Sequence, residues 1–273
     1  MKKTIIALLL TGLLAGCGAN GNNSSKDSSS SATKSSKVAS KTKKDSDSKK
    51  ASSSSSAAAS SSSSVASSSS ATTSTGNHYN DVTAAAKKQV GEQWLPSRIS
   101  SSAKYVNATA SGSSSNSVVK FYGGNNAVDL NDSSLQGTAD FTLTKKTYGS
   151  TAAAAAAINW IDSDSTLPTV NLGDNQIATK EGAAGSTYLH WNEGNWSITV
   201  QASNQANQDP TALGKQLVEI FRTKSLPAPT THGAAQFNMN AASGLQSISW
   251  NSGATVYVLT GSSAIATAES AVR

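Results

Sequence analysis

An internal repeat organises the second half of this chain. Residues 189–194 and 248–253 share the pattern Trp-Asn-x-Gly, and in each segment a large aliphatic residue stands two positions before the Trp. The match extends outward at a constant offset, so that Leu167-Pro168 falls on Leu226-Pro227. Repeated units of this size bury their apolar faces only beside a neighbour. We therefore expect one continuous sheet and not a string of separate domains.

Each Leu-Pro pair follows a segment that has the pattern of a helix. A residue before proline is disfavoured in the α region, so Leu-Pro ends the helix. The clearest helix runs from Pro210 to about Thr223, with Asp209 as its N-cap and Pro210 at its first position. Its apolar side consists of Leu213, Leu217, Ile220 and Phe221. Weaker helical patterns occupy residues 82–90, 152–161 and 265–272, the last one capped by Ser262.

Short alternating runs between the helices predict strands at 187–191, 196–200, 236–239, 245–250 and 255–259. The Asn and Gly residues of the Trp-Asn-x-Gly pattern tolerate positive φ and predict tight turns between them. A fainter third copy begins at Leu95-Pro96 and places Phe121 where the others have Trp, with an insertion around residues 131–147. The unit is thus a helix, Leu-Pro and about three strands. It predicts an α+β fold whose antiparallel sheet is built from tandem units and covered by helices on one face.

The stretch between Gly18 and Gly76 consists mostly of Ser, Ala, Thr and Lys. It cannot bury enough apolar surface to offset chain entropy. We therefore expect residues 17–76 to form a long disordered tether and residues 77–273 to form the folded domain. A flexible chain of about 60 residues has an r.m.s. span of roughly 40 to 45 Å, so the tether acts as a spacer.

A basic start and an apolar run precede the tether. Lys2 and Lys3 come before the apolar residues 5–14, which are too few to span a bilayer of roughly 30 Å and predict a cleaved signal peptide. With Leu14-Ala15-Gly16-Cys17, this start resembles the signal peptide and lipobox of bacterial lipoproteins. The resemblance implies removal of residues 1–16 and attachment of a diacylglyceryl group, with acyl chains such as palmitate, to the Cys17 thiol. It implies an extracytoplasmic protein anchored by lipid to the cell membrane.

The lipobox, the Trp-x-x-Gly hairpins and the helices that end in Leu-Pro together resemble a family of surface lipoproteins of lactic-acid bacteria. The resemblance covers nearly the whole chain and implies a Gram-positive envelope. Its motifs are structural and imply no activity. Cys17 is the only cysteine, which excludes an intramolecular disulfide.

The positive charge of the chain belongs to the tether. The net charge is +6, but eight lysines lie between residues 26 and 50, and from Asn77 onward acids slightly outnumber bases. This distribution argues against a nucleic-acid partner for the domain. Lysines near an anionic surface contribute about 1 kcal/mol each to the binding free energy, so the tether could lie against the membrane or anionic wall polymers. The alternative is that its lysines only keep it soluble.

Catalytic and metal-binding patterns are weak. His78, His190 and His232 have no partner at metal-ligand spacing, and there is no Gly-x-Ser-x-Gly elbow. Within the domain, Asp162 and Asp164 are the only close carboxylate pair, in a helix-to-strand loop where helix termination or solubility explains them. We therefore expect no enzymatic activity, no cofactor and no metal site.

Aromatic residues supply the ligand-binding candidates. Trp191 and Trp250 recur at equivalent positions, which predicts that both belong to the core. Trp196 and Tyr188 lack Trp or Tyr counterparts in the last copy and are predicted to lie at the surface. His190 alternates with Trp191 and should point away from the buried face, toward water. Tyr188, His190 and Trp196 are therefore the candidate ligand-binding residues.

The sequence thus favours a non-enzymatic surface lipoprotein that displays a binding or structural domain on the outer face of the cytoplasmic membrane. One alternative is an envelope enzyme such as a hydrolase. Another is the solute-binding lipoprotein of an importer, although that class needs two α/β lobes with parallel strands, and this chain predicts hairpins.

Overall fold

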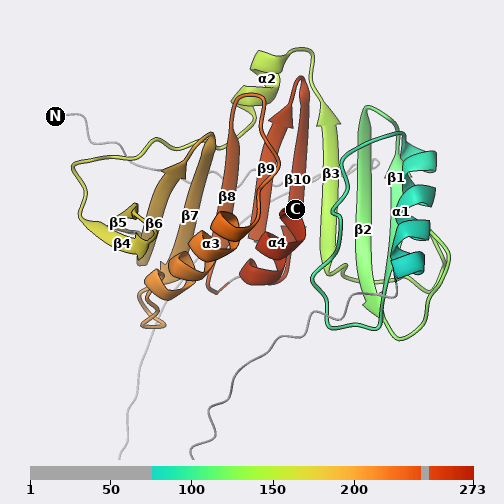
Figure 1. Ribbon diagram of the computed structural model, residues 1–273, viewed down its shortest axis with the longest axis horizontal. Coiled ribbons are helices and arrows are strands. Elements are labelled where there is room, and N and C mark those ends of the chain that lie inside the picture. The colour runs from blue at the N-terminus through green and yellow to red at the C-terminus, as the bar shows by residue number, and fades with distance from the viewer. Residues whose placement is uncertain (1–75, 241–245) are drawn as a thin grey trace, which may run out of the picture. The chain divides into compact units, whose positions relative to one another are not determined.

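The computed structural model of the protein describes residues 76–240 and 246–273 (Figure 1). The predicted signal peptide (1–16), Cys17 and the predicted tether (17–76) up to residue 75 lie outside the described residues. The helices are α1 (Gly76–Val90), α2 (Thr151–Ala156), α3 (Thr211–Thr223) and α4 (Ala264–Ala271). In the part of the chain that the structure describes, no helix is long and apolar enough to cross a membrane.

A single sheet of ten strands dominates the fold. The strands are β1 (Tyr105–Gly112), β2 (Asn116–Gly124), β3 (Phe141–Thr147), β4 (Thr169–Gly173), β5 (Gln176–Ala183), β6 (Ser186–Glu193), β7 (Trp196–Ser203), β8 (Gly233–Asn238), β9 (Gln246–Ser252) and β10 (Thr255–Gly261). Their order across the sheet is β1-β2-β3-β10-β9-β8-β7-β6-β5-β4. Among the strands of the described residues, only β7 and β8 pair in parallel. The predicted α+β fold and the continuous, mainly antiparallel sheet are confirmed.

The parallel pair depends on α3, which connects the end of β7 to the start of β8. Parallel neighbours need a crossover, and a helix is the usual one. α3 lies close to the sheet because Gly214 has no side chain: a Cβ there would stand 2.6 Å from Cδ2 of Leu189. Asp209 accepts hydrogen bonds from both the backbone N–H and the hydroxyl of Thr211, and so supports the start of the helix.

One face of the sheet forms the main core, and we call it the covered face. Side chains on this face alternate with those on the other, as the strand period requires. Fully buried members include Phe121, Leu143, Leu189, Trp191, Val200, Ile248 and Leu259. α1, α3 and α4 add their apolar sides, and the segment 91–104 adds Leu95 and Ile99 to the same cluster.

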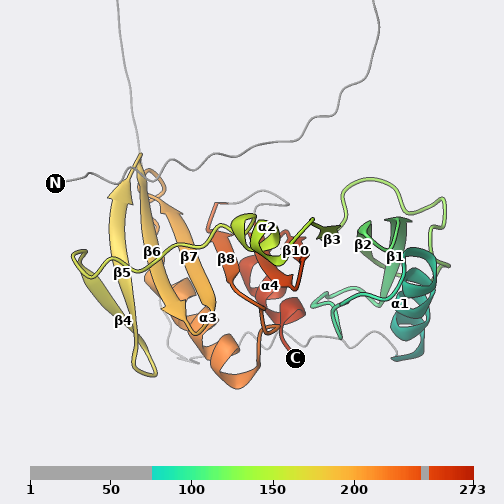
Figure 2. The same cartoon turned by 90° about the horizontal axis from the view of Figure 1, so that it is seen from above.

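Helix α2 lies on the opposite face, which we call the open face (Figure 2). Its Ala154, together with Ile158, packs against Ala234 of β8 and Val256 of β10 in a small separate cluster. The prediction that the helices cover one face is therefore wrong for α2. The reason is topological, because the chain must travel from β3, inside the sheet, to β4 at its far edge, and it does so across the open face.

The helix predicted at 152–161 is also too long, because α2 ends at Ala156. Residues 157–168, which we call the crossing linker, continue over the open face. There the backbone N–H of Ile161 donates to Ser197 Oγ at 3.2 Å, and Asn192 Nδ2 donates to the Ile161 carbonyl at 2.9 Å. Backbone groups bonded to the sheet in this way are not available to a helix. The strands predicted between residues 187 and 259 correspond to β6 to β10, although the strand predicted at 236–239 runs one residue past the end of β8 and residue 245 lies outside the described residues.

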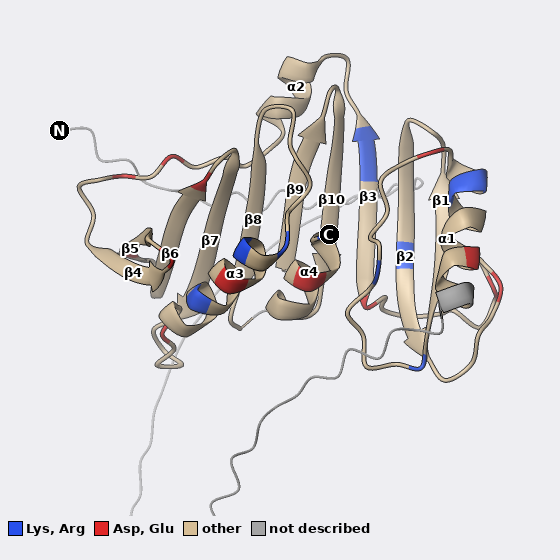
Figure 3. Cartoon of the chain, viewed as in Figure 1, with Lys and Arg blue, Asp and Glu red and all other residues tan. Residues whose placement is uncertain are grey.

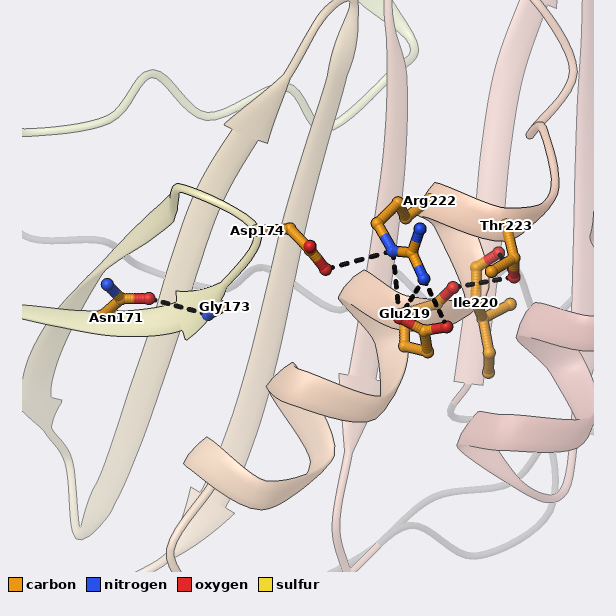
Figure 4. Close-up of polar contacts among 7 residues, drawn as sticks. All are labelled: Asn171, Gly173, Asp174, Glu219, Ile220, Arg222 and Thr223. Atoms are coloured by element: carbon orange, nitrogen blue, oxygen red, sulfur yellow. Dashed lines mark hydrogen bonds and ion pairs between the residues drawn. The ribbon is translucent and has the colours of Figure 1, made fainter.

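Hairpin β4–β5 forms one edge of the sheet, and polar contacts tie its turn to α3 (Figure 4). Asn171 Oδ1 accepts a hydrogen bond of 2.7 Å from the Gly173 N–H, which shapes the turn. Arg222 Nε of α3 lies 3.1 Å from Asp174 Oδ2, and its Nη2 lies 2.8 Å from Glu219 Oε1. The guanidinium group therefore connects the last turn of α3 to the edge hairpin.

Candidate functional site

The two Trp residues of the repeated pattern lie in the core. Trp191 has no exposed surface and Trp250 is 2% exposed, so the prediction for both is confirmed. The Trp250 ring stacks on Tyr257 with centroids 5.3 Å apart and meets the edge of Trp94 at 4.6 Å. These rings contribute to packing and are not accessible to a ligand.

Trp196 was predicted to lie at the surface, and this is wrong because it is only 7% exposed. Its ring lies on the covered face, above Gly233 of the neighbouring strand β8. A Cβ at Gly233 would stand 2.6 to 2.7 Å from the Trp196 ring, so the missing side chain makes room for the indole. Trp196 is therefore a core residue.

His190 points away from Trp191, as predicted, but not into water. It is 8% exposed, because the crossing linker passes over it. Its Nδ1 lies 3.0 Å from Thr199 Oγ1, and its buried Nε2 has no partner among the described residues. Burial lowers the pKa of His190 below its ordinary value, so the ring is neutral at neutral pH.

Tyr188 is the remaining candidate and lies partly exposed on the open face, two residues before His190 on β6. Its neighbours across the strands are Glu181 on β5 and Gln201 on β7. Trp196 faces the opposite side of the sheet. The structure therefore does not bring the three candidate residues together in one site.

The Asn of each Trp-Asn-x-Gly segment has a role that the sequence did not reveal. Asn192 Oδ1 accepts bonds of 2.8 and 2.6 Å from the N–H and hydroxyl of Ser163, and so holds the crossing linker. Asn251, fully buried, accepts from the N–H groups of Thr231 and His232 at 2.9 and 3.2 Å. Both side chains point to the open face and fasten a connecting segment there. Their recurrence beside the buried Trp was the available signal.

The carboxylate pair of the crossing linker serves local structure. Asp162 Oδ1 accepts a 2.8 Å hydrogen bond from Trp160 Nε1. Asp164 accepts from the hydroxyl and the N–H of Thr166, and these two bonds lower the pKa of its carboxyl. The Trp160 ring in turn lies against His232, with centroids 4.3 Å apart and the ring planes tilted by 34°. The two carboxylates thus bond separately to their own neighbours.

A small pocket opens on the covered face, lined by Glu193, Trp196, Ile198, Phe221 and Leu226. Its volume is about 110 Å³, which is well below the roughly 300 Å³ at which sites for small molecules begin. Partial burial raises the pKa of the Glu193 carboxyl at its rim. The pocket has room for a few waters.

The open face of β2, β3, β10 and β9 carries an ordered array of accessible polar side chains. We call eight residues of this array the open-face platform, and all are partly or fully exposed: Val118, Lys120, Thr142, Thr144, Ser247, Ser249, Val258 and Thr260. They form two rows across the sheet, one running Lys120, Thr142, Thr260, Ser247 and the other Val118, Thr144, Val258, Ser249. Five of the eight carry hydroxyl groups. The platform can therefore offer hydrogen bonds from a surface set by the sheet itself.

Among residues 76–240 and 246–273, no three His, Cys, Asp or Glu side chains come together as possible metal ligands. No protein-family model, curated protein or solved structure matches the chain.

Proposed function

We propose that the protein is a lipid-anchored lipoprotein of the cell surface, and that its domain binds a component of the cell envelope through the open face of the sheet. The anchor is proposed from the sequence of residues 1–17, where a basic start and a short apolar run lead to Leu14-Ala15-Gly16-Cys17. The family of surface lipoproteins of lactic-acid bacteria is proposed on the same residues and on the repeated hairpins.

The observation that supports the binding proposal is that helices cover one face of the sheet much more completely than the other. The covered face receives α1, α3, α4 and the segment 91–104. Across the platform, by contrast, the side chains stay partly or fully exposed, although Val258 also packs against the α2 cluster, and none of the eight residues is an acid. An antiparallel sheet can leave one face to solvent, and such a face is free to take a ligand.

The finer architecture belongs to the same proposal. We propose that α1 with β1–β3, α2 with β5–β7, and α3 with β8–β10 are three copies of one unit. Phe121, Trp191 and Trp250 then occupy one equivalent position, in the middle strand of each unit, and at most 2% of any of these side chains is exposed. In this interpretation, β4 is an extra strand added at the edge of the sheet.

Two experiments test the function. Because acylation needs the thiol, Cys17→Ala should abolish incorporation of labelled fatty acid and leave the unprocessed precursor, whereas Cys17 wild type is labelled and fractionates with membranes. Continued labelling of the variant would refute the anchor. Binding is tested by incubating the purified chain with peptidoglycan, teichoic acid, neutral polysaccharide and lipid vesicles, and the proposal fails if none of them is retained.

A further inference from the structure

Charge is unevenly distributed along the sheet, although the domain as a whole is nearly neutral. Residues 148–210, which include β4 to β7, carry six Asp or Glu and a single Lys. Residues 76–147, which include α1 and β1 to β3, carry seven Lys or Arg and five Asp or Glu. Figure 3 shows this contrast, with blue segments on β2 and β3. The β1–β3 end is therefore the cationic end.

Four of the six lysines of this end lie on or beside one of the two faces of the sheet. On the covered face, Lys145 is buried and donates to the carbonyl of Glu92 at 3.2 Å, and Lys87 lies 3.6 Å from the Glu92 carboxylate. Lys120 and Lys146 are exposed on the open face. Neither lies within 4.0 Å of a carboxylate oxygen of the described residues. These two ammonium groups are free to bind an anion.

Lys120 and Lys146 stand at two ends of the same surface. Lys120 begins one row of the platform, opposite Thr142, and Lys146 lies on β3 two residues beyond Thr144. One strand and four residues separate them, which corresponds to roughly 14 Å. Between them lie the hydroxyls of Thr142 and Thr144.

Each lysine also has an aromatic neighbour. The Lys146 ammonium lies 4.8 Å from the centroid of the Tyr148 ring, which packs against the α2 cluster and holds the lysine on this side of the sheet. Tyr122 follows Lys120 on the same face of β2 and is partly exposed. Asp140, one residue before β3, accepts a 2.7 Å hydrogen bond from the Gly123 N–H at the end of β2. The surface thus combines two separated cations with an array of hydroxyls.

We infer that the open-face platform, with Lys146, binds an anionic polymer whose repeating unit carries both phosphate and hydroxyl groups, namely a polyol or sugar phosphate of the cell wall. The lysines contact phosphates about two units apart, and the Thr and Ser hydroxyls between them bond to the hydroxyls of the polymer. This inference rests on the proposed function, because only an extracytoplasmic domain meets such a polymer.

The test compares affinities for one probe, deacylated lipoteichoic acid, which is a poly(glycerol phosphate). The full chain is used, so that the tether lysines are constant. Lys120→Gln with Lys146→Gln removes two charges from the platform, and Lys88→Gln with Lys215→Gln removes two from exposed positions on α1 and α3. All four sites are exposed, so both variants should keep the wild-type melting temperature.

We expect the platform double variant to bind about tenfold or more weakly than wild type, since a lysine near an anionic surface contributes about fivefold. The helix double variant should stay within twofold of wild type, and Lys120→Arg with Lys146→Arg should bind as wild type does. Raising the salt concentration should weaken the wild type more than the platform variant, because salt screens exposed charges.

Three results would overturn the inference. The first is an equal loss of affinity in the two double variants. The second is that the wild type binds a single-stranded oligonucleotide with the same number of phosphates as tightly as it binds deacylated lipoteichoic acid. The third is that it binds a phosphate-free polysaccharide equally tightly. The proposed function fails separately, when the chain carries no lipid and fractionates with the cytoplasm. The affinity comparison does not depend on that result, so the two failures are distinguishable.

Discussion

Replacing Trp196 with Ala tests whether neighbouring strands, and not the repeat, decide which aromatic residues form the core. The repeat alone makes Trp196 expendable, because the position at the same offset is Thr255. The structure makes it a core residue, 7% exposed, with its ring over Gly233 and 6.5 Å from the ring of Trp250.

The cost of Trp196→Ala follows from the area and the space involved. A Trp side chain buries about 150 to 250 Å², which corresponds to roughly 4 to 6 kcal/mol at about 25 cal/mol per Å². The Ala side chain still buries a part of that area, so the loss is smaller than the full value. Large-to-small changes of aromatic residues in cores cost about 3 to 5 kcal/mol of stability. The pocket beside Trp196 is already unfilled, so neighbouring side chains cannot readily close the cavity that Trp196→Ala would leave. We expect a loss of about 3 to 5 kcal/mol.

Urea denaturation followed by circular dichroism measures this loss, with Trp160→Ala as the matched control. The Trp160 ring is partly exposed on the crossing linker and contacts only His232 among the described aromatic rings. Its removal should cost about 1 kcal/mol. Equal losses of about 1 kcal/mol in both variants would refute the burial argument and return Trp196 to the list of surface candidates.

Other variants test separate contacts. Gly233→Ala should cost about 1 to 3 kcal/mol through overpacking against Trp196, whereas Gly182→Ala on β5, which meets no atom within 4 Å, should be nearly neutral in the same denaturation assay. Asn251→Ala should cost about 2 to 4 kcal/mol of stability because it leaves the N–H groups of residues 231 and 232 without a hydrogen bond. The control Asn125→Ala, at an exposed position, should change stability little. Similar losses in both variants would show that Asn251 does not hold the segment of residues 231 and 232 on the sheet. Burial lowers the pKa of His190 from 6.5, so the unfolded chain takes up that proton first and stability should fall as the pH drops below about 6.5. His190→Gln should flatten this dependence in thermal melts across pH 5 to 8, and an unchanged slope would show that other groups cause it.

The parts of the fold that the sequence predicted are those with local patterns. α3 has a capped, one-sided apolar pattern, and β6, β7, β9 and β10 alternate around tight turns, so their positions were correct within a few residues. β5 was missed because a Lys and a Glu interrupt its alternation and Ile177, its one large apolar residue, is 48% exposed. The repeat pattern places β3 within an insertion around residues 131–147. Its Lys145 is buried because it bonds to the carbonyl of Glu92, a contact that no local pattern indicates.

The prediction that Trp196 and His190 are accessible at the surface is wrong for a related reason. Burial of Trp196 depends on a glycine in a strand that joins the sheet only after α3, and burial of His190 depends on the crossing linker. Both are long-range contacts. The glycine before Ala234-Ala235 was a usable signal, because a glycine within a strand often marks the close approach of another group.

The proposed units are joined in two different ways in the sheet, although their sequence patterns are similar. The second and third units meet through β7 and β8 in parallel, which α3 makes possible by crossing the covered face. The first and third units meet through β3 and β10, which are antiparallel and equivalent strands of their units. The same strand type therefore bonds to two different partners. What the proposed units share is a buried aromatic residue in the middle strand, and all three of these residues belong to one continuous core. Because the connection from β3 to β4 begins with α2 over β8 to β10, then crosses the open face above β7 and β6, and leaves β2 and β3 accessible, the accessible platform is itself a consequence of how the chain connects β3 to β4.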